Sequence, residues 1–521
     1  MSRRERTAGR GAAELLGTFG HHVGEREVAH KAPRERVNGR VAPRRGMTRR
    51  GRGWSAAEAP LATYRVPSFD LGAFYPLLAS SGLPAVGAFM GYDALSGGAF
   101  YVHPVEWVLS TLQEIVTNPN MIFFGEPGRG KSTTIVAFLL RMMEFGVKTL
   151  IAGDTKGEYS PVVRGLGYTP IEIGHGLGNI LNPLDLGPLR AVWHTMRTDD
   201  AVMALNSLIG KWTSLLKALV AAQGHQLTVT DTMVCTKVLR ELIGVADGTT
   251  APKTVTIPQL HAALANPTEA FWRECRFASR QDFLDMLRGA TDGLSALVTG
   301  PLAGLFDDET NFDVDWDAPI QSMDLSRLDA LGNSAVAVAM TCLGSWSSSA
   351  ADLRRSGQIR IVVRDEVWRQ MRLGSAMIET LDSDLRLSRS QQKIELLAMH
   401  KPGDLAAVGD AGSKDVAIAK EFLGLIGTRV LLGQTTRIAD ELAKELRLRP
   451  EEQAEVMGWA NGRKGRALWK IQDRSFKVQT LRPAVEKALF DTNAQLRTDA
   501  ASSSTPTAPG AASVGGGVGG V

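Results

Sequence analysis

Cysteine is scarce in this chain, with three residues among 521. Cys235, Cys275 and Cys342 are widely spaced and match no disulfide or metal-binding pattern. The sequence therefore excludes a disulfide framework and a cysteine-based zinc module. A reducing compartment fits this usage best, and we expect the protein in the cytoplasm.

A convincing membrane-spanning run is also missing. Residues 71–92 are uncharged but contain two prolines and four glycines, which make a poor membrane helix. We interpret this segment as strands and turns of a small leading portion. The first residues lack the apolar core of a signal peptide. The 44% hydrophobic and 22% charged fractions are typical of a globular protein, and the length predicts two to four domains or one domain with insertions.

Little net charge remains over the whole chain, but it is unevenly distributed. Residues 1–53 contain 14 Lys and Arg against 5 Glu, a net +9, so the rest carries −5 of the total +4. Such an arm can bind phosphate backbones, including DNA, or anionic lipid. A disordered leader, or a gene start that truly begins at Met47, remains the alternative. The low-complexity tail at 493–521 is predicted to be disordered.

The strongest motif is a phosphate-binding loop. "GEPGRGKS" at 125–132 fits G-x-x-x-x-G-K-[ST] between an apolar strand at 121–124 and an apolar helix at 133–143. Glycines let backbone N–H groups surround phosphates, Lys131 reaches the β- and γ-phosphates, and Ser132 ligates Mg²⁺. We predict that ATP and Mg²⁺ bind here. The predicted nucleotide-binding residues of the loop are Gly125, Glu126, Pro127, Gly128, Arg129, Gly130, Lys131, Ser132 and Thr133.

A second apolar strand at 147–154 follows the helix, so we predict a βαβ unit and a largely parallel sheet. Asp154, Lys156 and Glu158 cluster where it ends, at the edge where open α/β sheets bind ligands. Asp154 is a candidate nucleotide-binding residue, and an ordinary charged surface turn is the open alternative.

The segment "IVVRDEVW" at 361–368 predicts another strand, ending in two carboxylates. The two-residue period places Asp365 on the face toward the phosphate loop and Arg364 on the opposite face. Asp365 would hold Mg²⁺ through water, and Glu366 would orient and deprotonate the attacking water. Burying Arg364 costs several kcal/mol unless it is paired, so a carboxylate partner or exposure at a subunit interface is expected.

Together with the loop, "DTKGEY" at 154–159, "NPLD" at 182–185 and "DEVW" at 365–368 resemble the conjugative-transfer ATPases of type IV secretion systems. The VirB/TraC branch of the FtsK/HerA-like motors is the most similar, over about residues 85–492. The chain departs from it in having a much shortened N-terminal domain. The resemblance implies an α/β, RecA-like P-loop NTPase fold with a mostly parallel sheet. It also implies a homo-oligomeric ring, a hexamer, which meets secretion-channel and coupling proteins in the cytoplasm or peripherally on the inner face of the membrane.

The predicted organisation has six parts. Apolar residues recur at helical spacing from 188 onward, in a stretch too long for a loop. We expect a basic arm, a small β-rich portion, the first half of the ATPase core, a helical insertion, the second half with a C-terminal hairpin, and a tail. Their ranges are 1–53, 54–118, 119–187, 188–300, 301–492 and 493–521.

Two further site residues are implied by the resemblance. Arg389 matches the position of an arginine finger that faces a neighbouring subunit, with Arg386 as the alternative. The family's next strand ends in Thr-Gln, whose amide senses the γ-phosphate, and here Met399 and His400 stand there. An imidazole can donate or accept a hydrogen bond, so His400 is the candidate sensor.

Three functions remain open from the sequence. The first is an ATPase that energises conjugative DNA transfer or type IV secretion. The second is a DNA-pumping coupling protein or translocase, which the missing membrane anchor and the "DEVW" signature argue against. The third is an assembly subunit that binds ATP with little turnover, which Arg364 and His400 suggest.

Overall fold

A computed structural model gives the fold. The basic arm and the predicted tail lie outside the described residues. No helix within the described part combines the length and low polarity that a membrane crossing needs. The residues that the structure describes are 81–110, 115–187, 189–190, 193–244, 252–312, 315, 318–352, 358–371, 375–406 and 414–490.

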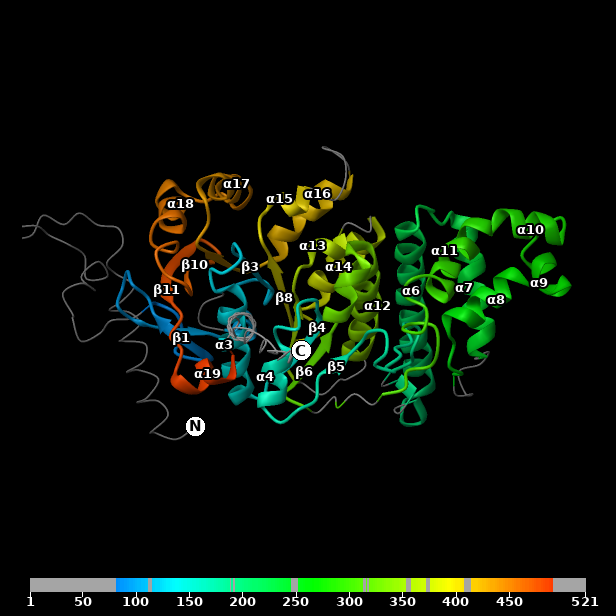
Figure 1. Ribbon diagram of the computed structural model, residues 1–521, viewed down its shortest axis with the longest axis horizontal. Helices are drawn as coiled ribbons and strands as arrows, with labels where there is room; N and C mark the ends of the chain where they lie inside the picture. The colour runs from blue at the N-terminus through cyan, green and yellow to red at the C-terminus, as the bar shows by residue number, and fades with distance from the viewer. Residues whose placement is uncertain are drawn as a thin grey trace, which may run out of the picture. The chain divides into compact units, whose positions relative to one another are not determined.

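The core is a sheet of nine strands with the order β11-β10-β9-β3-β8-β7-β4-β6-β5 (Figure 1). The seven strands from β9 to β5 run parallel, and β10 and β11 are antiparallel. The predicted βαβ unit is confirmed. The strands are β3 (Met121–Phe124), β4 (Lys148–Asp154), β5 (Ile171–Glu172), β6 (Ile320–Asp324), β7 (Arg360–Arg364), β8 (Lys393–Met399), β9 (Thr428–Leu432), β10 (Arg466–Ile471) and β11 (Arg474–Gln479).

Alternate residues of β3 pack into two separate cores. Met121 and Phe123 belong to the core that contains α3, whereas Ile122 and Phe124 belong to the core that contains α12. All four are buried, as expected for a parallel strand covered on both faces. The helices that flank the strands of the core are α3 (Lys131–Met142), α4 (Ser160–Gly165), α12 (Asn333–Asp352), α13 (Trp368–Met371), α14 (Ser375–Leu387), α15 (Gly403–Ala406), α16 (Lys414–Glu421), α17 (Thr436–Leu446), α18 (Pro450–Met457) and α19 (Ala484–Leu489).

A small hairpin precedes the core. Strands β1 (Ala88–Tyr92) and β2 (Ala99–Val102) pair antiparallel and are followed by α2 (Pro104–Leu109). Asp93 forms a bridge with Val478 of β11, so this hairpin is joined to the edge of the main sheet. Phe100 packs its ring against Trp469 of β10. The leading portion therefore continues the core on the side of β10 and β11.

Helices dominate between β5 and β6. The longest, α6, packs on α12 and α14 and buries Trp212. Helix α7 begins with a capping box in which Thr228 and Asp231 satisfy each other's backbone N–H groups, and Gly244 ends it in the left-handed conformation. The segment contains α6 (Thr198–Ala222), α7 (Val229–Ile243), α8 (Ile257–Ala265), α9 (Glu269–Glu274), α10 (Arg280–Met286) and α11 (Arg288–Thr299).

Candidate nucleotide site

The phosphate loop connects β3 to the N-terminus of α3, as predicted. Gly128 and Gly130 have φ values of +79° and +97°, a left-handed region that glycine enters without steric cost. A Cβ at Gly130 would lie 2.8 Å from the backbone nitrogen of Gly465. This glycine is therefore required both by the turn and by the close approach of the segment that leads into β10.

A cavity of about 410 Å³ lies over this loop. Its walls come from the loop, from the turn after β4, from His400 at the end of β8, and from the two ends of the β10–β11 hairpin. The hairpin residues were missed by sequence reasoning, because no local motif marks them. The lining residues are Glu126, Pro127, Gly128, Gly130, Lys131, Ser132, Thr133, Lys156, Glu158, His400, Lys464, Gly465, Thr480 and Arg482.

The loop lysine faces the first carboxylate of β7. Lys131 Nζ lies 3.3 Å from Asp365 Oδ1, and both side chains are buried. Its ammonium makes no hydrogen bond within the described structure. The Tyr159 hydroxyl donates to Asp365 Oδ2 at 3.2 Å. A buried ammonium without a hydrogen-bond acceptor, beside a carboxylate and Ser132, fits a phosphate and a magnesium ion at this place.

The second carboxylate is surrounded by donors. Glu366 Oε1 accepts from Lys156 Nζ at 2.6 Å and lies 2.9 Å from His400 Nε2, while Oε2 accepts from Trp368 Nε1 at 2.5 Å. Burial by itself raises the pKa of Glu366, but the hydrogen bonds with His400 and Lys156 and the charge of Lys131 lower it well below its usual range. The carboxylate is therefore ionised, as a base must be.

The backbone at this carboxylate is unusual. Glu366 has a φ of +52°, a left-handed conformation that costs a residue with a side chain on the order of 1–3 kcal/mol. Its N–H donates to Asp365 Oδ1 at 2.9 Å, which helps to hold the turn. The turn places the two successive carboxylates next to Lys131 and Lys156, which line the cavity, and a strained backbone is characteristic of functional sites.

The ring of His400 connects the loop to this carboxylate. Nδ1 lies 3.2 Å from the carbonyl oxygen of Gly125 while Nε2 faces Glu366. Both neighbours are oxygen acceptors, and only a protonated ring donates to both. His400 follows the end of β8, at the position of the predicted sensor. Its imidazole contacts both the loop and the second carboxylate.

Arg364 points away from the cavity into a buried network of charges. Its Nε donates to Glu395 Oε2 at 3.0 Å and its Nη2 donates to Asp384 Oδ2 at 2.7 Å. Lys393 Nζ lies 3.0 Å from Glu395 Oε1 and 3.7 Å from Asp384 Oδ1. Two cations and two carboxylates thus compensate one another. The predicted carboxylate partner of Arg364 is confirmed.

Asp154 stabilises the turn that forms part of the cavity wall. Its carboxylate is buried and accepts hydrogen bonds from the backbone N–H groups of residues 158, 159 and 160. Burial raises the pKa of Asp154 to about 7, with the nearby carboxylates of Asp324 and Asp365 acting in the same direction. Lys156 and Glu158 line the cavity, and Asp154 holds the turn that presents them.

The candidate finger lies away from this cavity. Arg389 donates to the carbonyl oxygen of Thr117, ahead of β3, so it stands at the amino edge of the parallel strands. The phosphate loop follows the opposite, carboxyl edge. Arg386 is exposed and pairs with Asp382 at 2.7 Å. Neither arginine belongs to the site of its own subunit, and a role for either requires a neighbouring copy.

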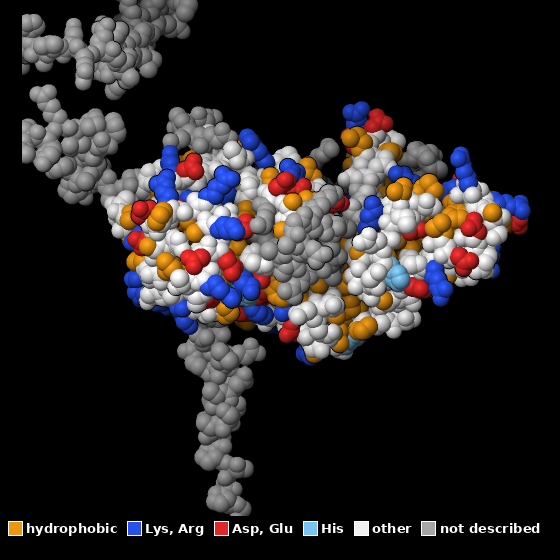
Figure 2. All heavy atoms as spheres, turned by 90° about the horizontal axis from the view of Figure 1, so that it is seen from above, with side chains coloured by type: hydrophobic (Ala, Val, Ile, Leu, Met, Phe, Trp, Pro, Cys, Tyr) orange, Lys and Arg blue, Asp and Glu red, His pale blue; other side chains and the backbone are white. Residues whose placement is uncertain are grey.

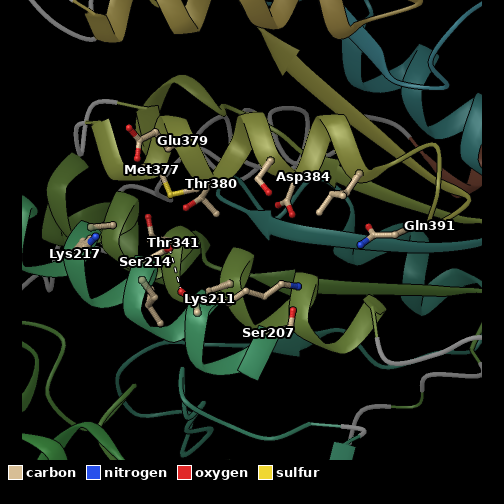
Figure 3. Close-up of a pocket in the computed structure, with 16 residues that line it drawn as sticks. Ser207, Lys211, Ser214, Lys217, Thr341, Met377, Glu379, Thr380, Asp384 and Gln391 are labelled. Atoms are coloured by element: carbon tan, nitrogen blue, oxygen red, sulfur yellow. Dashed lines mark hydrogen bonds between the residues drawn. The ribbon is translucent and has the colours of Figure 1, made fainter. Parts of the chain in front are cut away.

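A second cavity, of about 390 Å³, lies between α6 of the helical segment and α14 of the core. Figure 3 shows Glu379, Thr380 and Asp384 of α14 on one wall, facing Ser207, Lys211 and Ser214 of α6 on the other. Asp384 also belongs to the network of Arg364. Asp384 therefore belongs both to the wall of this cavity and to the buried charge network.

No protein-family model and no curated protein matches this chain. Among solved structures, it is similar to VirB4 of Thermoanaerobacter pseudethanolicus, with 18% identity, a TM-score of 0.59, and coverage of 78% of this chain and 99% of that one. The plasmid coupling protein TrwB in complex with ADP and Mg²⁺ gives 13% identity, a TM-score of 0.47, and coverage of 71% and 87%. The VirB4 likeness establishes the fold. The predicted RecA-like α/β architecture with a mostly parallel sheet is confirmed.

Proposed function

We propose that this chain is an ATP-hydrolysing motor subunit that energises conjugative DNA transfer or type IV secretion and works in an oligomeric ring. The observation that carries the proposal is a phosphate loop whose Lys131 lies 3.3 Å from Asp365, with Glu366 bonded to the cavity-lining residues Lys156 and His400, within the fold of VirB4. The motif resemblance to the VirB/TraC branch supports the same cellular role.

The residues divide the chemistry between them. Backbone N–H groups of the loop and the N-terminus of α3 bind phosphates, and Lys131 compensates their charge. Ser132 and Asp365 would hold Mg²⁺, which supplies charge neutralisation at the β- and γ-phosphates. Glu366 accepts the proton of the attacking water, and His400 positions it from the loop side. The Lys464 and Arg482 side chains supply positive charge on the hairpin wall.

Steady-state ATP hydrolysis tests this function. We expect Glu366→Gln to lower turnover by about 10²- to 10⁴-fold, the usual contribution of a general base, with nucleotide binding retained. Normal hydrolysis by this variant would show that the base has been assigned wrongly. Wild-type protein that binds ATP without turnover would instead favour the assembly subunit.

Single- and double-stranded DNA, added to the same assay, separate the motor classes. Turnover that ignores DNA supports the secretion ATPase, and DNA-stimulated turnover with translocation supports a DNA pump. On the face in Figure 2, Lys and Arg side chains stand singly or in small groups among neutral and acidic ones. The basic arm at 1–53, with its net charge of +9, is the proposed contact for DNA, and it lies outside the described residues.

A mixing experiment tests the ring and its finger. Arg389→Ala and Glu366→Gln should each be inactive alone. If Arg389 acts on the neighbouring subunit, mixed rings regain turnover, because a Glu366→Gln subunit can supply its arginine to a site with an intact base. Arg386→Ala, at the alternative finger position, is the comparison: it should keep its turnover if Arg389 is the finger, and loss of turnover that is regained in mixed rings would assign the finger to Arg386. Mixtures that stay inactive would contradict a finger that acts between subunits.

A further inference from the structure

The site contains a second lysine, Lys156, to which the sequence analysis assigned no role. Lys156 stands in the turn after β4, and its side chain is 46% exposed on the wall of the cavity. Its Nζ nevertheless donates to the buried Glu366 at 2.6 Å. Burial by itself would lower the pKa of Lys156, but the hydrogen bond to Glu366 and its charge raise it. The lysine is therefore a charged group directly at the candidate base.

Three of the about four acceptor positions of the Glu366 carboxylate are occupied, including both positions on Oε1. Oε1 is shared by Lys156 and His400, and Oε2 accepts from Trp368. A carboxylate that accepts three donors, one of them an ammonium ion, is a weak acceptor for the proton of a water molecule. Before Oε1, the oxygen beside the cavity-lining residues Lys156 and His400, can orient and deprotonate water, one of these two donors has to leave.

Lys156 is the donor best placed to leave. His400 is fixed at its other ring nitrogen by the carbonyl oxygen of Gly125, and Trp368 lies at the start of α13, on the same turn as Glu366. The lysine has a flexible, partly exposed side chain that borders the same cavity as the loop. Its ammonium can change partners without any movement of the backbone.

The neighbouring pair shows the same arrangement. Lys131 compensates Asp365 in this structure, yet the loop motif assigns its ammonium to the phosphates. It must therefore change partners when a nucleotide binds. Lys156 likewise compensates Glu366, the residue that follows Asp365. Because Glu366 has to lie near the terminal phosphate to act on the attacking water, the acceptor within reach of Lys156 is that third phosphate.

On the basis of the function proposed above, we propose that Lys156 is a positioning residue that occupies Glu366 in the empty site and moves to the terminal phosphate of a bound nucleoside triphosphate. The base is then released only when the third phosphate is present. A diphosphate cannot reach the ammonium, so Glu366 stays occupied. The chain would thereby distinguish ATP from ADP by the partner of one side chain.

Equilibrium binding of fluorescent ADP and of a fluorescent, non-hydrolysable ATP analogue tests this without any turnover. Lys156→Met should weaken binding of the analogue by about tenfold or more, the usual effect of losing a charge-assisted hydrogen bond, and leave ADP affinity within about twofold. Equal loss of ADP and analogue binding would overturn the proposal. Lys464→Met, which removes another lysine of the same cavity, is the control and should change both affinities by the same factor. If it alters their ratio as much as Lys156→Met does, the discrimination is a general charge effect and the proposal fails.

The Glu366→Gln background separates direct contact from simple neutralisation. If Lys156 contacts the phosphate, Lys156→Met weakens analogue binding in this background too. If the lysine only neutralises Glu366, removing it there has no effect, and the proposal is overturned. Wild-type protein that binds neither nucleotide would refute the proposed function as well, whereas normal wild-type binding with unchanged Lys156→Met would refute this inference alone.

Discussion

Arg364 and Glu366 lie two residues apart at the end of β7, but their charged groups lie on different sides of the sheet and have different partners. The guanidinium faces the packed side of the sheet, where Asp384 and Glu395 hold it among buried groups. The carboxylate of Glu366 lies on the side of the phosphate loop, where one of its partners is Lys156, a half-exposed lysine of the cavity wall. A charge with fixed, buried partners contributes to folding, and a charge with a movable partner is available for chemistry.

The charge of Asp154, at the end of the neighbouring strand β4, is compensated in a third way. It is as deeply buried as Arg364, but its acceptors are satisfied by backbone N–H groups. Backbone dipoles compensate a full negative charge less completely than a cation does. This difference explains why burial raises the pKa of Asp154 to about 7, while the cations around Glu366 lower its pKa.

The largest effect on stability is expected from breaking the packed network. Arg364→Met removes the guanidinium that is bonded to both Asp384 and Glu395, and removal of one partner from a buried pair costs about 3–5 kcal/mol. Urea unfolding of the nucleotide-free protein should show this loss in the free energy of unfolding. A loss below about 1 kcal/mol would mean that water or other groups already compensate the network.

Two variants serve as controls for that measurement. Arg364→Met combined with Glu395→Gln leaves one cation and one carboxylate, so much of the lost stability should return. Lys156→Met also removes one positive charge, but on the side of the cavity. Because that ammonium is half exposed, its loss should cost less than about 1 kcal/mol. If Arg364→Met and Lys156→Met lowered the free energy of unfolding equally, the charges on the two sides of β7 would not differ in their contribution to stability.

The buried carboxylate of Asp154 should make stability depend on pH. Its folded pKa of about 7 lies above its unfolded value of about 4, so the folded state binds the proton more tightly. Stability present at low pH is lost as the pH rises from about 4 to about 7. Between pH 5 and 7.5 the wild type should lose about 2–3 kcal/mol relative to Asp154→Asn. Parallel pH profiles for the two proteins, measured by urea unfolding, would show that Asp154 is already ionised at pH 5.

The smallest effect is expected in the phosphate loop, where two glycines differ in their surroundings. Both have left-handed φ values, so alanine at either should cost about 1–3 kcal/mol. A Cβ at Gly128 meets open space, whereas one at Gly130 would press on the backbone of Gly465. Gly130→Ala should therefore lower the melting temperature and the ADP affinity more than Gly128→Ala. Equal effects would show that the hairpin segment can move away from the loop.

Much of the candidate site could be predicted from local patterns. The loop motif placed its glycines and Lys131 correctly between β3 and α3. Period-2 alternation placed Asp365 toward the loop and Arg364 on the opposite face, and desolvation cost required a carboxylate for the arginine. These predictions succeeded because each depends on backbone geometry over a few residues or on the cost of burying one group.

Other features could not be predicted, because they depend on distant segments. The strand order places β8 and β9 on either side of β3, although some 270 residues or more separate them in the sequence. The hairpin wall with Lys464 and Arg482 is brought over the loop only by the addition of β10 and β11 to the edge of the sheet. The cluster at 154–158 was found, but its division into one supporting and two cavity-lining residues was not.

The sequence by itself determined that a phosphate loop lies in an α/β core, and it predicted a magnesium carboxylate and a base beside that loop, because those signals are local and periodic. Only the tertiary structure decided which cation occupies each carboxylate. Lys156 and Glu366 are 210 residues apart in the chain and meet because β4 and β7 are neighbouring strands whose carboxyl ends meet at one edge. Pairing across a sheet depends on strand order, and strand order is set by the packing of the whole core.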